Sequence, residues 1–296
     1  MTITTGFGAV LVMLLWALCF PLITIGLNYS PPMVFATFAA TLAGLVLLSA
    51  AQYLKRPPIQ GASIWGGIVL VGFTLTSIGL FGMYYGGGRV SPGLATVISN
   101  TQPLIAAILA SFLLGENLSR GQKFGLLAGF LGILLIGIPS LSGSDSQSIG
   151  VIFILIGATG IALGNVVLKR LAGRVDTLRA MGWQLIIGAI PLAVISVATE
   201  NITAVTLTLP FIMSLMALSV FVIAMPFALW FMLLQRTTLS QLNAFTFLTP
   251  IFGLIIGAVF FAEQLHAYEI MGIVLGFIGI SAVSLQSKKV WKICLN

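Results

Sequence analysis

Two amide side chains, Asn100 and Gln102, stand beside Pro103 inside a long apolar stretch of this sequence. An amide group both donates and accepts hydrogen bonds, so it can bind the polar groups of a small solute or join two neighbouring helices. Both roles are open for each amide, and we take the pair beside the proline as the best candidate for contact with a solute. Further amides inside apolar stretches are Asn165, Gln184, Gln241 and Asn243.

Aromatic side chains are the second group of candidates, because their faces bind apolar groups and cations. Trp16 lies deep inside the first apolar stretch, which favours a position in the wall of a cavity. Tyr84 and Trp183 lie closer to the ends of their stretches, where a place in the aromatic belt at the membrane surface is the alternative. Tyr85 and Trp230 complete this group.

Pro103 and Pro250 each lie at the midpoint of an apolar stretch. A proline has no backbone N–H, so it leaves the carbonyl four residues earlier, here that of Ser99 or Thr246, without its helical donor. A free acceptor at this depth in a membrane is tolerated only beside protein or a wet cavity. We therefore predict that both prolines kink helices that line the pathway and act as hinges. The alternative is a static kink that a neighbouring hydroxyl group fills.

Glu116 and Glu263 lie at the ends of apolar stretches rather than in the middle. A carboxylate in that position usually pairs with a cation or with the N-terminus of the next helix, and we predict this structural role in preference to proton coupling. Acidic residues are absent from the middle of every apolar stretch. The sequence therefore names no coupling ion.

The residue patterns of an enzyme or a metal site are missing from the sequence. The chain has one histidine, His266, and two aspartates, and it lacks the HExxH, GxSG and paired-aspartate patterns. Its two cysteines, Cys19 and Cys294, form neither a disulfide framework nor a metal site. We predict no enzymatic activity, no cofactor and no metal. A channel is not favoured either, since no filter motif such as TVGYG is present.

The composition requires a lipid environment. Apolar residues make up 59% of the 296 positions and charged residues only 6%, which is too few charges to cover a water-exposed surface. The net charge of +7 is then an orientation signal, and nucleic-acid binding is not expected. A helix needs about 20 apolar residues to cross a bilayer. Ten such stretches occur, at residues 6–27, 31–54, 62–85, 92–114, 121–138, 149–168, 179–199, 210–234, 239–261 and 267–286.

Lysine and arginine residues fall almost entirely on one side of these ten spans. With the N-terminus in the cytoplasm, twelve of the thirteen basic residues lie inside and only Arg89 lies outside. Four acidic residues, Asp145, Glu200, Glu263 and Glu269, lie outside as well. We therefore predict that both termini are cytoplasmic.

The two halves of the chain repeat each other. A shift of 147 residues matches Arg89 with Arg236 and Pro103 with Pro250. A unit of five helices has an odd number of spans, so the second copy enters the membrane from the opposite side. Inverted repeats are typical of secondary transporters, which open a central site alternately to either face. The alternative is a duplication without mechanical meaning.

A family resemblance rests on two segments, residues 91–133 (SPGLATVISNTQPLIAAILASFLLGENLSRGQKFGLLAGFLGI) and residues 238–280. Each has a mid-helix proline, a helix-end glutamate shortly before a leucine, and a glycine-rich helix after it. Both segments resemble the EamA-type half of the drug/metabolite transporter superfamily. Trp16 and Phe20 resemble the first helix of that family, which adds Phe20 to the candidates. We predict that ten residues contact the solute: Trp16, Phe20, Tyr84, Asn100, Gln102, Asn165, Trp183, Gln184, Asn243 and Thr246. The resemblance implies ten helices around a central cavity and transport of small organic metabolites, often outward.

The predicted fold is an all-α integral membrane protein with ten transmembrane helices in two inverted five-helix repeats around a central cavity. We place the first repeat at 1–140, an external linker at 141–148, the second repeat at 149–288 and a short basic cytoplasmic tail at 289–296. The predicted function is a secondary transporter that exports amino acids, related metabolites or drugs by alternating access. The alternative is an uptake carrier or a channel-like permease for a small polar solute. We expect a bacterial cytoplasmic membrane, and a monomer or a homodimer.

Overall fold

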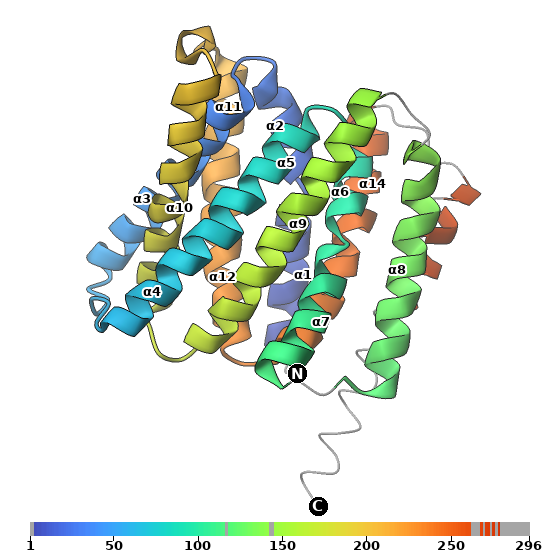
Figure 1. Ribbon diagram of the computed structural model, residues 1–296, viewed down its shortest axis with the longest axis horizontal. Coiled ribbons are helices and arrows are strands. Elements are labelled where there is room, and N and C mark those ends of the chain that lie inside the picture. Colours follow the sequence, from blue (N-terminus) through green and yellow to red (C-terminus); the bar gives the residue numbers. More distant parts are fainter. Residues whose placement is uncertain are drawn as a thin grey trace, which may run out of the picture.

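The computed structural model describes residues 3–115, 118–141 and 145–261, together with scattered positions between 267 and 278. All regular elements within these ranges are helices, and they run side by side as one bundle (Figure 1). The first-half elements are α1 (Ile3–Ala17), α2 (Cys19–Leu27), α3 (Pro32–Tyr53), α4 (Ala62–Val71), η1 (Gly72–Ile78), α5 (Gly79–Gly87), α6 (Pro92–Ser99), α7 (Gln102–Leu114) and α8 (Arg120–Leu141).

The elements described in the second half are helices as well. They are α9 (Asp145–Leu171), α10 (Thr177–Thr199), η2 (Ile202–Ala204), α11 (Leu209–Ala217), η3 (Leu218–Ala224), α12 (Met225–Leu234), α13 (Leu239–Asn243), η4 (Ala244–Phe247) and α14 (Leu248–Phe261). Here η1 and η3 are π-helices, and η2 and η4 are 3-10 helices.

Eight helical segments within the described residues are long and apolar enough to cross a membrane. The prediction of an all-helical chain with many membrane spans is therefore confirmed. Of the two remaining predicted spans, the fifth coincides with the 22-residue helix α8, and the tenth lies almost wholly outside the described residues. The count of ten spans stays a prediction. Glu116 and Glu263, expected at helix ends, also lie outside the described residues.

The two halves share their irregularities as well as their lengths. The candidate spans Ala62–Gly87 and Leu209–Leu234 correspond under the shift of 147 residues, as do Pro92–Leu114 and residues 239–261. The π-helices η1 and η3 occur at matching places in the first pair of segments. Breaks before the prolines occur at matching places in the second pair. Such shared departures from regular geometry indicate two structurally repeated halves.

The helix pair α3 and α10 is joined closely along its length. A Cβ atom added to Gly44 would lie 3.0 Å from the carbonyl oxygen of Gly182, so the two backbones almost touch. At one end the Glu200 carboxylate accepts hydrogen bonds of 3.0 and 2.9 Å from the backbone N–H groups of Met33 and Val34. It fills the capping role that Pro31, at the N-cap of α3, cannot fill with its own side chain.

The opposite ends of α3 and α10 are joined by a second set of charges. Asp176 caps α10 by accepting a hydrogen bond from the backbone N–H of Arg179, and its carboxylate lies 3.9 Å from the Nε atom of Arg56. The guanidinium group of Arg179 in turn donates to the side-chain oxygen of Gln52. Because both ends of the pair are held, we expect α3 and α10 to move as one body.

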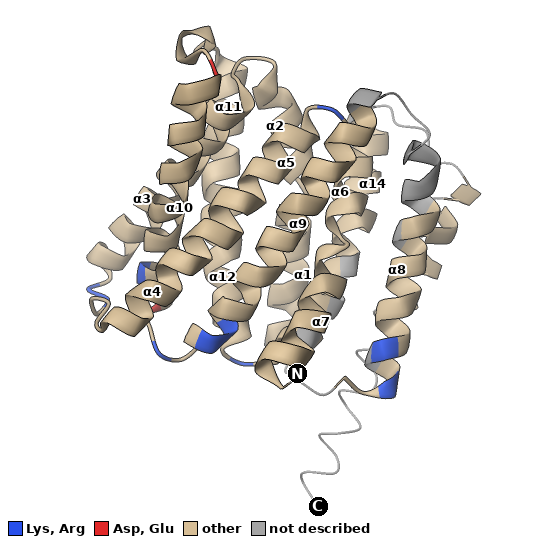
Figure 2. Ribbon diagram, in the orientation of Figure 1, with Lys and Arg blue, Asp and Glu red and all other residues tan. Residues whose placement is uncertain are grey.

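Basic residues gather at one end of the bundle, as Figure 2 shows. They lie at the α3–α4 and α9–α10 connections and at the start of α8, whereas the α5–α6 turn at the other end holds Arg89 alone. This is the partition that the sequence predicts. The assignment of the basic end to the cytoplasm rests on the positive-inside rule and stays a prediction.

Candidate functional site

A cavity of about 100 Å³ lies at the centre of the bundle. Helices of both halves line it: α1, α2, η1, α5, α6 and α7 from the first, and α9, α10, η3, α12, η4 and α14 from the second. Six of the ten residues predicted to contact solute are among its lining residues. They are Trp16, Phe20, Asn100, Gln102, Asn165 and Thr246.

The chain breaks its helix at the cavity in the first half. Helix α6 ends at Ser99, and the backbone N–H groups of Asn100 and Thr101 bond to carbonyls only three residues earlier. Helix α7 then begins at Gln102, so Pro103 lies in its first turn. Proline is well tolerated there, since the N–H that it lacks would have no helical partner. The predicted kink in a continuous helix is thus a break between two helices.

A matching break interrupts the second half. The 3-10 helix η4 precedes α14, and Pro250 lies in the first turn of α14 and is buried. The sequence predicts that Thr246 contacts the solute, because Pro250 leaves the Thr246 carbonyl without its helical donor. In the structure the Thr246 hydroxyl donates a 2.6 Å hydrogen bond to the carbonyl of Asn243. The hydroxyl of Thr249, another lining residue, donates to the sulfur of Met13 at 3.2 Å.

The amides of Asn100 and Gln102 both line the cavity with unused hydrogen-bonding atoms. Residues two apart on an ideal helix point about 200° apart, and the break at Thr101 is what brings both to one space. The Asn100 amide nitrogen donates to the carbonyl of Thr96 at 2.9 Å, while its side-chain oxygen has no partner among the described residues. The Gln102 side-chain nitrogen likewise has none.

These orphaned atoms are a signal for a ligand. Asn100 and Gln102 are only 5% and 7% exposed, and a buried polar atom without a partner costs about 1–3 kcal/mol. A solute in the cavity that donates to Asn100 and accepts from Gln102 would remove that cost. The pair therefore offers one acceptor and one donor to an occupant.

Aromatic side chains build another part of the lining. The Trp230 indole N–H donates to the side-chain oxygen of Asn165 at 2.9 Å. The ring of Trp16 lies 5.0 Å from that of Trp230 and meets the ring of Phe227 edge-on at 6.2 Å. Asn165 thus acts by fixing Trp230 in the wall. The sequence marks Trp230 only as one of several aromatic residues in apolar stretches.

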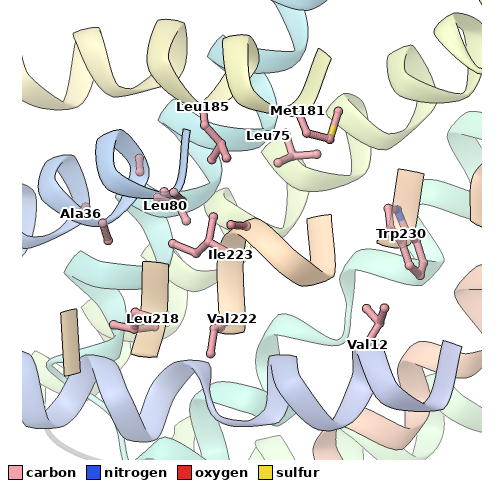
Figure 3. Close-up of a cluster of buried hydrophobic side chains, with 14 of the residues drawn as sticks. Val12, Ala36, Leu75, Leu80, Met181, Leu185, Leu218, Val222, Ile223 and Trp230 are labelled. Carbon is pink, nitrogen blue, oxygen red and sulfur yellow. The ribbon is translucent and has the colours of Figure 1, made fainter. Parts of the chain in front are cut away.

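The rest of the lining is apolar except for Thr96 and Ser99, whose hydroxyl groups donate to the carbonyls of Pro92 and Thr96. Figure 3 shows part of it, with Leu75, Leu80, Met181 and Ile223 converging from different helices. Charged side chains are absent from the lining formed by the described residues. The cavity can therefore hold a small solute through apolar contact, aromatic faces and two amides.

Four predicted residues lie elsewhere. The Gln184 side-chain oxygen accepts a 2.6 Å hydrogen bond from the hydroxyl of Thr76, so this amide joins two helices. Trp183 packs edge-on against Trp65 at 5.6 Å, and Tyr84 meets Phe35 edge-on at 5.4 Å. The side chain of Asn243 is fully buried without a hydrogen-bond partner among the described residues, and it does not line the cavity.

Comparison with known proteins identifies two copies of one family in this chain. Residues 4–138 and residues 148–285 each match the EamA-like transporter family. The chain belongs to that family. The two matches coincide with the two structural halves, and membership places the chain among transporters and not among enzymes.

Similar proteins occur in distant organisms. The chain is 32% identical to a WAT1-related chloroplastic protein of Arabidopsis thaliana, with 86% of this chain and 63% of that protein covered. It is 32% identical to the uncharacterized transporter YvbV of Bacillus subtilis, with 93% and 90% covered. It is 27% identical to a probable amino-acid metabolite efflux pump of Salmonella typhimurium, with 93% of each chain covered.

A solved crystal structure shares the fold. It superposes with a TM-score of 0.80 at 18% sequence identity, and the match covers 96% of this chain and 99% of the other. The EamA-family chain described here is thus a multi-pass membrane protein of a transporter fold.

Proposed function

We propose that this chain is a secondary transporter that moves small organic metabolites out of the cell by alternating access. The observation that carries the proposal is the position of the central cavity between two discontinuous helices, one from each half of the chain. Transporters bind solutes at such helix breaks, and rocking of the two repeats opens the site to one face and then the other. Asn100 and Gln102 would meet the solute there.

The lining favours a solute with an apolar body and a polar end. Trp16, Phe227 and Trp230 offer aromatic faces, and the two amides offer hydrogen bonds. The volume of about 100 Å³ lies well below the roughly 300–1,000 Å³ of pockets for drug-sized ligands, which favours small metabolites over drugs. Amino acids and related compounds fit this description, and the name of the Salmonella typhimurium relative supports the same class.

The proposed topology has ten spans with both termini in the cytoplasm, and the proposed location is the cytoplasmic membrane of a bacterium. The gathering of basic residues at one end of the bundle supports this orientation. Export, like the efflux pump among the relatives, is the proposed direction. The protein would act as a monomer or as a homodimer.

Counterflow in proteoliposomes tests the proposal. Purified protein is reconstituted into liposomes that are loaded with one unlabelled amino acid at a time, and the same labelled amino acid is added outside. A carrier accumulates label transiently because it exchanges one solute for another, whereas a channel lets both concentrations equilibrate without an overshoot. Saturable counterflow with at least one amino acid is expected. An overshoot with none of the amino acids would contradict this substrate class, and leak without an overshoot would favour the permease alternative.

A further inference from the structure

A second pocket lies at the end of the bundle away from the basic end, where α2 ends, α3 begins and α5 ends (Figure 1). Its volume is about 590 Å³. We call it the Arg89 pocket, after the one charged side chain in its lining. The polar side chains beside Arg89 are those of Asn28, Tyr29, Ser30, Tyr84 and Tyr85.

Arg89 has no anionic partner among the described residues. The ion pair found among the described residues joins Arg56 to Asp176, at the other end of the bundle. Glu200 is at the same end as Arg89, but its carboxylate is engaged by the backbone N–H groups at the start of α3. The positive charge of Arg89 is therefore available to a negatively charged ligand.

The guanidinium group is held in place by helix α5, which ends two residues before Arg89. One of its terminal nitrogens, Nη1, donates a hydrogen bond to the carbonyl of Tyr85, and its carbon lies 4.0 Å from the centre of the Tyr85 ring. That ring is itself packed against Phe81 and Phe153. A guanidinium group has five N–H donors, so this anchoring leaves donors free for a ligand. Because the side chain is already held in one conformation, little rotamer entropy is lost when a ligand binds.

Tyr84 provides a second, independent sign of a ligand. Its side chain is 0% exposed and lines the Arg89 pocket, yet its hydroxyl has no hydrogen-bond partner among the described residues. Its ring packs edge-on against the ring of Phe35. A buried hydroxyl without a partner is costly, and an acceptor oxygen in the pocket would satisfy it.

The pocket and the central cavity share two of their lining helices. Helix α2 lines the cavity with Phe20 and the pocket with Leu27, and helix α5 lines the cavity with Met83 and the pocket with Tyr84. Phe20 and Leu27 are separated by about 10 Å along the helix. The Phe20 ring packs against the backbone of Gly87, and a Cβ atom added to Gly87 would lie 3.0 Å from the ring. A thin apolar barrier thus separates the two spaces.

We propose that Arg89 and Tyr84 bind the carboxylate of the transported solute at the outer mouth of the pathway. The proposal rests on the transport function proposed above and adds a second site to it. An arginine fork pairs with both oxygens of a carboxylate, and the Tyr84 hydroxyl adds a third donor. The repeat places Arg236 at the equivalent turn of the second half, where its N–H donates to the carbonyl of Leu233 as that of Arg89 does to Gly86, both at 2.9 Å. Each half of the chain therefore has one arginine at this turn.

Chemical protection of Arg89 tests the site without transport. The full-length protein in detergent is treated with the arginine reagent p-hydroxyphenylglyoxal, and mass spectrometry measures the rate of modification at each arginine. Leucine and leucinamide are the probes, because they differ only in the carboxylate. Leucine is expected to slow modification of Arg89 several-fold and leucinamide is not, while the exposed Arg174 reacts equally in all samples. Equal protection by both probes, or by neither, would overturn the proposal.

A phospholipid headgroup is the other source of a suitable oxyanion, and the same measurement separates the two. Nanodiscs of phosphatidylcholine are compared with nanodiscs that also contain phosphatidylglycerol, in the absence of amino acids. The proposal expects the same rate at Arg89 in both membranes. If phosphatidylglycerol alone slows the reaction as much as leucine does, the site binds lipid and the proposal is wrong.

Two conservative variants test the contribution of each donor. Tyr84→Phe removes only the hydroxyl group, and loss of its hydrogen bond should weaken leucine protection of Arg89 by roughly two- to tenfold. Tyr53→Phe is the control, since the exposed Tyr53 lies at the end of α3 away from the pocket and should leave protection of Arg89 unchanged. Unchanged protection in Tyr84→Phe would remove Tyr84 from the site. Absence of counterflow in the parent protein would contradict the proposed function. The protection assay would still show whether Arg89 binds a carboxylate, because it does not depend on transport.

Discussion

The indole N–H of Trp230 donates a hydrogen bond to the side-chain oxygen of Asn165 at 2.9 Å, in the wall of the central cavity. Both side chains are almost fully buried, at 3% and 2% exposure. The bond fixes the angle of the Trp230 ring, against which Trp16 packs. One amide thus determines the shape of the aromatic half of the cavity.

Replacement of Asn165 should therefore destabilise the cavity wall, because it removes the hydrogen bond that holds Trp230. Asn165→Leu leaves the Trp230 N–H buried without a partner, which should cost about 1–3 kcal/mol of folding free energy. Thermal unfolding in detergent measures this loss, and the tryptophan emission should shift as the ring loses its anchor. The double variant Asn165→Leu/Trp230→Phe removes donor and acceptor together and should lose less than the sum of the single changes. Additive losses would show that the two residues do not interact.

A comparison of two buried glutamines separates solute contact from structural support. The side-chain nitrogens of both glutamines have no partner among the described residues. Gln102 lines the central cavity, whereas Gln184 does not line it and accepts a hydrogen bond from Thr76 with its side-chain oxygen. Gln102→Ala should weaken solute binding by two- to tenfold, the worth of one hydrogen bond, with little change in the unfolding temperature. Gln184→Ala should lower the unfolding temperature and leave the affinity of the folded protein nearly unchanged. Half-saturation in counterflow and thermal unfolding measure the two effects. The reverse pattern would place the solute elsewhere.

Pro250 offers a test of the helix break in the second half. Because it lies in the first turn of α14, Pro250→Ala should change the folding free energy by no more than about 1 kcal/mol, against the roughly 3 kcal/mol typical of a helix interior. The alanine N–H can extend α14 backwards into η4 and stiffen the break. We expect a slower counterflow rate at unchanged yield of folded protein. An unchanged rate would mean that the break does not act as a hinge.

The membrane-spanning helices and the positions of the two proline distortions could be predicted from the sequence, because both follow from local chemistry. Long apolar stretches require helices in lipid, and Pro103 marks the place where α7 begins. The roles of individual polar residues could not be predicted from the sequence, because these roles depend on neighbours that lie far away along the chain. Gln184 meets Thr76 across 108 positions, and Glu200 reaches the start of α3 across 167. In sequence, Gln102 and Gln184 look alike.

Close helix packing is a further feature that only the structure reveals. A Cβ atom on Gly82 would lie 2.3 Å from the carbonyl oxygen of Phe153 and 2.5 Å from the nitrogen of Gly157. Because backbone atoms cannot move aside as a side chain can, Gly82→Ala should push α5 away from α9 and lower the unfolding temperature. Gly66 in α4 has open space around it, and Gly66→Ala should raise stability by about 0.5–1 kcal/mol through its better helix propensity. Equal effects of the two alanines would contradict the packing.

The orientation of the chain can be tested with one cysteine at each end of the bundle. Arg174 lies in the turn between α9 and α10, and Asn201 follows Glu200 after α10; both are exposed. In a variant without Cys19 and Cys294, Arg174→Cys and Asn201→Cys should be labelled by a membrane-impermeant maleimide from opposite faces. The positive-inside rule expects Asn201→Cys to react in intact cells and Arg174→Cys to react only after the membrane is opened. Since α10 is 23 residues long, about 35 Å, the two positions lie on opposite faces only if it crosses the membrane. Labelling of both positions from one face would refute a spanning α10. Labelling of Arg174→Cys alone in intact cells would show that the orientation is the reverse of the predicted one, with Arg89 on the cytoplasmic side.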